Sequence, residues 1–241
     1  MTSQGSRGRW LSLGVLIAIA LPIDLGVWSV SGRAQPRAAV AAAAEMLWVD
    51  LGELNDVLVQ HGYAPLPERL LLTGGMCPDC ASEDWRWRWR WGGGALFGRT
   101  SSRTEPGDRE AALGLDLGGA FLSRPLLSRG RSILQIGLFL GFGRATLELL
   151  NRRTDAFADA LETPTHLVAR RDLFAVEPFA EFEVRLSSRL GVRLQGGYLW
   201  TFGGAWRLGP DELGDLTLEL RGYSLRLLLT FYLLQPPCRD P

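Results

Sequence analysis

The sequence predicts an all-β protein: an antiparallel up-and-down β-barrel of about eight strands, preceded by a signal peptide and one short amphipathic helix. From Trp85 to Leu234, apolar and polar residues alternate with a period of two, which is the period of a β-strand. Ahead of this region lie an apolar N-terminal run and a single stretch with helical spacing. Because the chain has 241 residues, of which 46% are hydrophobic, we expect one domain with a sizeable core.

The N-terminus has the layout of a secretory signal. Arg7 and Arg9 precede an apolar run over residues 10–23, and small residues near position 34 allow cleavage before Gln35. The run is shorter than the roughly 20 residues that a membrane-spanning helix needs. The sequence therefore predicts export, with residues 1–34 as the signal peptide.

Residues 35–83 are predicted to form a lead-in to the barrel. Its Ala-rich start, 38–44, is interpreted as the flexible beginning of the mature chain or as the tail of a longer signal. Asp50 follows as a helix cap, and Gly62 stands where a helix would end. Between them the apolar residues fall on one stripe of a helix: Leu51, Leu54, Val57 and Leu58.

Cys77 and Cys80 form a C-x-x-C motif in the loop after this helix. Such a pair can be a redox couple, half of a zinc site or a small disulfide. A redox pair normally opens a helix in an α/β pattern, and zinc needs two further ligands, for which the sequence offers Cys238, His61 and His166. We predict a disulfide clip in an exported protein, and no metal or other cofactor.

Strand-like alternation fills the predicted barrel domain, residues 84–235, which a tail over 236–241 follows. One long interruption, residues 151–171, is predicted to be a surface loop with a short helix inside it. The clearest alternating segments are 85–91, 113–118, 134–142, 174–186, 190–195, 216–221 and 225–234.

Alternation defines two faces but does not say which one points inward. In a soluble barrel or sandwich the apolar face fills the core, whereas in a small membrane barrel it faces outward. Two features favour the outward orientation. The polar face is rich in glycine, which leaves room for long side chains, and it carries both signs of charge, as a buried ion network requires. The predicted interior network is Arg86, Arg88, Arg90, Asp116, Glu177, Glu181, Glu183, Arg185, Arg193, Glu219 and Arg226.

The run from Gly222 to Phe231, Gly-Tyr-Ser-Leu-Arg-Leu-Leu-Leu-Thr-Phe, resembles the closing strand of small outer-membrane β-barrel proteins of the eight-stranded, porin-like class. The resemblance rests on pattern and covers about residues 85–234. It implies an outer-membrane location and contact with membrane lipid. The interior of so small a barrel is filled by side chains.

The formal net charge of zero argues against nucleic acid as a partner, because binding phosphates takes a basic excess. We predict a non-enzymatic barrel with a structural role, or an adhesive role through residues 151–171. A soluble periplasmic or extracellular barrel that binds an apolar ligand or a protein is the alternative. A third hypothesis is a lipid-modifying or hydrolytic membrane enzyme using Glu177, Glu181 or His166.

Overall fold

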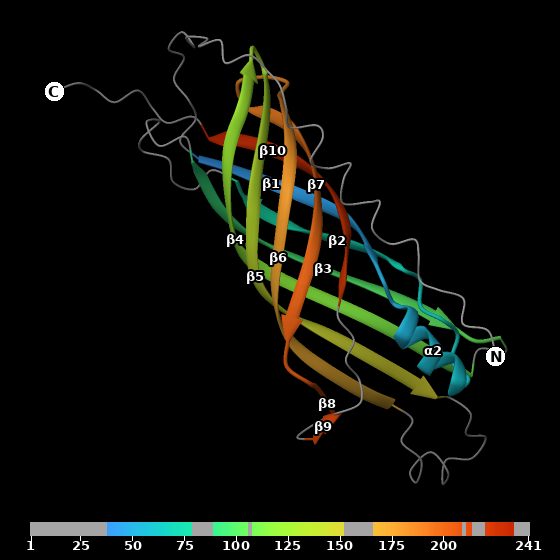
Figure 1. Ribbon diagram of the computed structural model, residues 1–241. Coiled ribbons are helices and arrows are strands. Elements are labelled where there is room, and N and C mark those ends of the chain that lie inside the picture. The colour runs from blue at the N-terminus through green and yellow to red at the C-terminus, as the bar shows by residue number, and fades with distance from the viewer. Residues whose placement is uncertain are drawn as a thin grey trace, which may run out of the picture. The chain divides into compact units, whose positions relative to one another are not determined.

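The computed structural model describes residues 38–78, 89–105, 108–151, 166–208, 211–213 and 220–233 (Figure 1). Several predictions lie outside these residues. They are the signal peptide 1–34, the helix inside the long loop, the tail 236–241, and the roles of Cys80, Trp85, Arg86, Trp87, Arg88 and Glu219.

Within the described residues, ten strands form one sheet, and eight of these strands close into a barrel. Each barrel strand pairs antiparallel with its neighbours, and the last strand pairs with the first from Ala38 opposite Leu233 to Val49 opposite Gly222. The barrel strands are β1 (Ala38–Val49), β2 (Arg69–Cys77), β3 (Arg90–Arg103), β4 (Arg109–Arg129), β5 (Ser132–Asn151), β6 (His166–Arg185), β7 (Leu190–Gly203) and β10 (Arg221–Leu233). The predicted closed all-β barrel is confirmed.

Two short strands extend this sheet beyond the barrel. β8 (Trp206–Leu208) pairs with β6, and β9 (Asp211–Leu213) pairs with β8. Trp206 is completely buried, so β8 contributes this side chain to the core.

The barrel begins earlier than predicted. The Ala-rich segment is β1, which pairs along most of its length with β10 on one side and β2 on the other. Alanine occupies both faces of this strand, so no alternation of apolar and polar residues marks it. The interpretation of residues 35–83 as a lead-in outside the barrel was therefore wrong.

The predicted helix is present as α2 (Gly52–Gln60), but it connects β1 to β2 instead of preceding the barrel. Leu54 and Leu58 are its buried residues. Gly62 ends the helix with a φ of 75°, a left-handed conformation that favours glycine. Asn55 fixes the following segment, because its side chain accepts from the Leu66 N–H at 2.7 Å and donates to the Leu66 carbonyl at 3.1 Å.

The loop between β5 and β6 is shorter than predicted. β6 begins at His166, where it pairs with Leu150, so residues 166–171 are strand. Arg170 and Arg171 are adjacent charged residues on opposite faces of β6. Because they interrupt the alternation of apolar and polar residues, the sequence did not predict a strand here.

The two ends of the barrel differ. At one end, which we call the terminal end, β1 starts, β10 stops, and β4 meets β5 in a turn around Gly130. At the other end, the helix end, lie α2 and the points where β3, β5 and β7 stop and β4, β6 and β10 start (Figure 1). Among the described residues, no helix is long and apolar enough to cross a membrane.

Candidate functional site

The barrel interior near its middle contains a buried ion cluster centred on Arg226 of β10. Its guanidinium donates to Glu45 of β1 at 2.5 Å and to Glu177 of β6 at 2.9 Å. All three side chains are no more than 2% exposed. The Ser224 hydroxyl donates a further bond to Glu177 at 2.6 Å. This cluster ties β6 to β10 and β10 to β1, across the closure of the barrel.

A second cluster, nearer the terminal end, surrounds Glu183 of β6. Its carboxylate lies 2.9 Å from Arg185, 3.3 Å from Arg90 and 3.4 Å from Arg193, and it accepts a bond from the Tyr232 hydroxyl at 2.7 Å. Glu183 is fully buried. One carboxylate therefore holds cations from β3, β6 and β7.

Glu181 extends the second cluster towards the first. It pairs with Arg193 at 3.2 Å and accepts a hydrogen bond from the Gln135 amide at 2.5 Å. Glycine makes room for such side chains, because a Cβ at Gly197 would stand 2.7 Å from an oxygen of Glu177. Gly197 therefore leaves room for a long charged side chain, as was predicted for the glycines of the polar face.

The two clusters together balance their charge, and a buried set of ions is tolerated only when its members are paired in this way. The paired groups are four carboxylates, Glu45, Glu177, Glu181 and Glu183, and four guanidinium groups, Arg90, Arg185, Arg193 and Arg226. Seven of these eight residues belong to the network that the sequence predicts. Glu45 was missed because it lies in the region 35–83, which was interpreted as a lead-in outside the barrel.

Asp116 corrects the predicted network. It is exposed on the outer face of β4, because Leu115 and Leu117 on either side of it point into the barrel and are buried. Leu113, Leu115 and Leu117 were expected on the outer face. They lie inside because the interior changes character towards the helix end.

The interior at the helix end is mostly apolar, with Arg171 of β6 as a buried charge within it. Side chains of β1, β2 and β4 meet the buried face of α2 there, and leucine fills most of the space. The principal residues are Leu47, Leu54, Leu58, Leu70, Leu72, Leu113 and Leu115. The barrel thus has two interiors in series, one ionic and one apolar.

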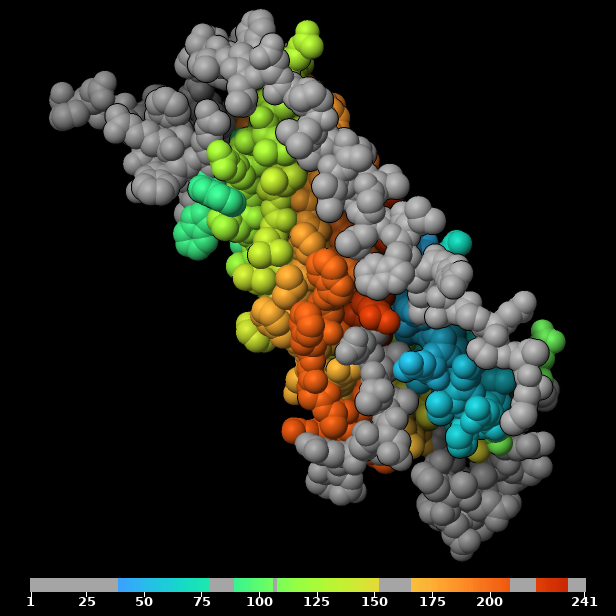
Figure 2. Space-filling model, viewed as in Figure 1, coloured from blue at the N-terminus to red at the C-terminus, as the bar shows by residue number. Residues whose placement is uncertain are grey.

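The polarity of the outer face changes in the opposite sense to that of the interior. Around the ionic half, the outward side chains are mostly apolar, as on β10, whose 13 residues alternate without a break between buried and exposed. The outer faces of β5, β6 and β7 lie side by side in Figure 2. We call the apolar surface around the ionic half the outer band. Its exposed members include Trp91, Leu134, Leu138, Leu140, Phe182, Leu194, Leu225, Leu227, Leu229 and Phe231.

Aromatic residues border the outer band on the side of the helix end, and we call them the aromatic row. Tyr198 contacts Trp200 and Tyr223 with ring centroids 4.8 and 5.0 Å apart, and Phe142 contacts Phe174 at 5.1 Å. Further members are Trp48, Phe97 and Phe202, all exposed. Trp91 of β3 and Trp89, just before the strand, are exposed near the terminal end, with Arg90 between them pointing inward.

Beyond the aromatic row, charged residues cover the outer face. Arg144 pairs with Asp172 at 2.8 Å, and Arg99 pairs with Glu148 at 2.7 Å. The sequence of β6 shows the whole change. Its outward residues run from Phe182 and Phe174 to Asp172 and Arg170, while its inward residues run from Glu183 and Glu177 to Leu173 and Ala169. Inside and outside therefore exchange polarity near the aromatic row.

The other residues that the sequence analysis named as possible site residues do not come together in one site. Cys77 is disulfide-bonded, and its predicted pairing with Cys80 stays a prediction. Glu177 and Glu181 point inward and are held by arginine, whereas His166 is exposed on the outer face of β6. The described residues contain no group of three or more acidic, cysteine or histidine side chains that could hold a metal.

No protein-family model matches the chain, and no curated protein matches it in sequence.

Proposed function

We propose that the protein is an outer-membrane anchor whose ionic half spans the bilayer and whose apolar-cored half projects from it. The observation that carries this proposal is the exchange of polarity. A water-soluble barrel needs an apolar interior and a polar surface, and the helix-end half has both. The other half has a charged interior and an apolar surface bordered by aromatic residues, which is the arrangement of a membrane barrel.

The dimensions of the outer band support the proposal. A tilted strand crosses a bilayer with roughly 9–11 residues. β10 has 13 residues and β1 has 12, and their outward positions from the aromatic row to the terminal end are apolar. β4, β5 and β6 have 20 or 21 residues. The outward charges of β5 and β6, and Asp116 of β4, lie in the additional length towards the helix end, whereas the exposed Arg124 and Arg129 of β4 lie near the terminal end.

The connections suggest an orientation. Outer-membrane barrels have short periplasmic turns and longer extracellular loops. Two of the three connections at the terminal end are short turns, from β4 to β5 and from β6 to β7, and the third joins β2 to β3 over residues 78–89; we therefore propose that this end is periplasmic. The helix end, with α2 and the connection over residues 152–165, would then face outward.

The filled interior supports a structural or adhesive role without enzymatic activity. In eight-stranded barrels, side chains fill the lumen. Here the ion clusters and the leucine core occupy successive levels of it. The protein would therefore hold its projecting end at the membrane surface, and its partner would bind there.

An arginine in the outer band tests the proposal. Leu227 is 52% exposed near the middle of β10. In a bilayer, Leu227→Arg is expected to lower the free energy of unfolding by about 2–4 kcal/mol, because the cation must enter the hydrocarbon. The measurement is urea unfolding in phosphatidylcholine vesicles. The matched control is Ser101→Arg, which adds the same charge to the exposed outer face of β3 beyond the aromatic row and should cost less than about 0.5 kcal/mol. Equal effects of the two variants would contradict the proposal.

A further inference from the structure

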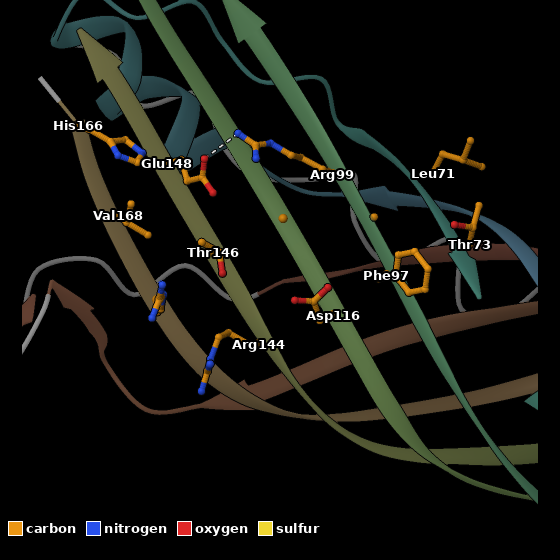
Figure 3. Close-up of a pocket in the computed structure, with 13 residues that line it drawn as sticks. Leu71, Thr73, Phe97, Arg99, Asp116, Arg144, Thr146, Glu148, His166 and Val168 are labelled. Atoms are coloured by element: carbon orange, nitrogen blue, oxygen red, sulfur yellow. Dashed lines mark hydrogen bonds and ion pairs between the residues drawn. The ribbon is translucent and has the colours of Figure 1, made fainter. Parts of the chain in front are cut away.

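A pocket of about 830 Å³ lies on the outer face of the barrel, over strands β2 to β6 (Figure 3). Because it lies beside the aromatic row, at the level where the outer face becomes charged, we call it the boundary pocket. Leu71 and Phe97 line it on the apolar side, and Arg99, Arg144 and Arg170 bring the cations.

The floor of the boundary pocket is built from small residues. Arg99, Gly114, Thr146 and Arg170 are register partners on four successive strands, from β3 to β6. Glycine and threonine in the middle of this row leave space between the two long arginine side chains. A ligand can therefore lie against the sheet with a cation on either side of it.

The charges around the boundary pocket are of both signs. Arg99 and Glu148 are 55% and 32% exposed, so their pairing is weak and open to competition by a ligand. Arg170 and Asp116 are exposed, and within the described part of the chain neither forms a hydrogen bond or ion pair. They lie on β6 and β4, with β5 between them, which separates their strands by roughly 10 Å.

An unpaired cation and an unpaired carboxylate, two strands apart on the same face, are together complementary to a zwitterion. A phosphate accepts charge-assisted hydrogen bonds from guanidinium groups, and a primary ammonium donates to a carboxylate. Phe97 and Leu71 continue the pocket into the outer band, where acyl chains would lie. Phe97 and Arg144 also border a smaller hollow with Phe142, so polar and apolar surfaces are contiguous here.

We infer that the boundary pocket binds a membrane lipid whose headgroup carries a phosphate and a primary ammonium, with Arg170 and Arg99 holding the phosphate and Asp116 the ammonium. This inference rests on the proposed membrane-spanning function. The inference adds a specific class of lipid to the proposed function, and it assigns a ligand to the exposed, unpaired Arg170 and Asp116.

The test is calorimetric titration of the full mature chain in dodecyl maltoside micelles with dioctanoyl phosphatidylethanolamine. Saturable binding is expected for the wild type. Arg170→Gln and Asp116→Asn should each weaken it at least about tenfold, because each removes a charged partner of the headgroup.

Arg103 and Glu110 supply matched controls: they form an exposed pair at 3.0 Å on the same outer face, outside the pocket. Arg103→Gln and Glu110→Gln should leave the affinity within about twofold of the wild type. Unfolding midpoints of all four variants verify that each is folded.

Two further probes identify the ligand chemistry. Dioctanoyl phosphatidylcholine should bind more weakly and should lose less affinity on Asp116→Asn, because its quaternary ammonium keeps its charge but has no N–H to donate. Phosphoethanolamine without acyl chains should bind more weakly than the lipid. Binding of the free headgroup as tightly as the lipid would indicate a soluble ligand and overturn the lipid assignment. Wild-type affinity in both pocket variants, or no saturable binding at all, would overturn the inference. In that case the proposed function stands as long as the protein still integrates into membranes.

Discussion

Replacing Arg226 by methionine is expected to lower the free energy of unfolding by about 3–5 kcal/mol, because it leaves two buried carboxylates without their cation. Arg226 is the residue that joins Glu45 to Glu177, and all three are almost completely shielded from solvent. Methionine fills much of the same volume, so the effect reports the charge more than a cavity. The measurement is urea unfolding of the folded barrel in vesicles.

Two comparisons isolate the role of burial. Arg144→Met removes an arginine that pairs with Asp172 at 2.8 Å, but these partners are 51% and 71% exposed. Its expected cost is less than about 1 kcal/mol. Adding Glu45→Gln and Glu177→Gln to Arg226→Met should recover part of the loss, since neutral amides do not require a counter-ion. A similar small cost for Arg226→Met and Arg144→Met would show that the interior cluster is solvated.

The second large effect is expected from Glu183→Gln, again about 3–5 kcal/mol, because three arginines lose their common carboxylate. The amide is isosteric with the carboxylate, so packing is preserved while the charge that faces Arg90, Arg185 and Arg193 is removed. The Tyr232 hydroxyl also loses a charge-assisted bond of 2.7 Å. The same unfolding assay measures the loss.

Glu148→Gln is the matched control for this substitution. Glu148 pairs with Arg99 at 2.7 Å and is 32% exposed on the outer face, so the same chemical change should cost less than about 1 kcal/mol there. An effect of Glu183→Gln no larger than that of Glu148→Gln would mean that the second cluster does not stabilise the barrel.

The sequence predicts part of this structure because local alternation survives in the finished barrel. Along β5, β7 and β10 the polar face lies inside, as expected, and Arg193 and Arg226 reach their predicted partners. Each of these strands has a clear contrast between its two faces. The predicted total of eight barrel strands is confirmed, but six of them, and not all eight, lie within the predicted barrel domain 84–235; β1 and β2 precede it and were not recognised.

Those two strands were missed because they lack contrast between their faces. β1 is mostly alanine on both faces, and β2 begins with three consecutive leucines, Leu70, Leu71 and Leu72. Period-two analysis detects a strand only where its two faces differ in polarity. Glu45, the one ionic residue within the Ala-rich segment, is the signal that marks the interior face of β1.

The exchange of polarity could not be predicted from any single segment. The first half of β4 alternates as clearly as β10, yet Leu115 is buried and Leu227 is exposed. Alternation gives the two faces, whereas the side that faces inward depends on the level in the barrel. Asp116 was assigned to the interior because one rule was applied to the whole domain. Only the pairing of strands places Asp116 beside Arg144, on the charged outer face.

Membrane integration of the wild-type protein tests the central claim most directly. The mature chain is refolded with phosphatidylcholine vesicles, washed with alkaline carbonate and floated through a sucrose gradient. If the outer band meets lipid, the protein floats with the vesicles and needs detergent to be dispersed. A protein that stays at the bottom of the gradient, folded and monodisperse without detergent, would contradict the account.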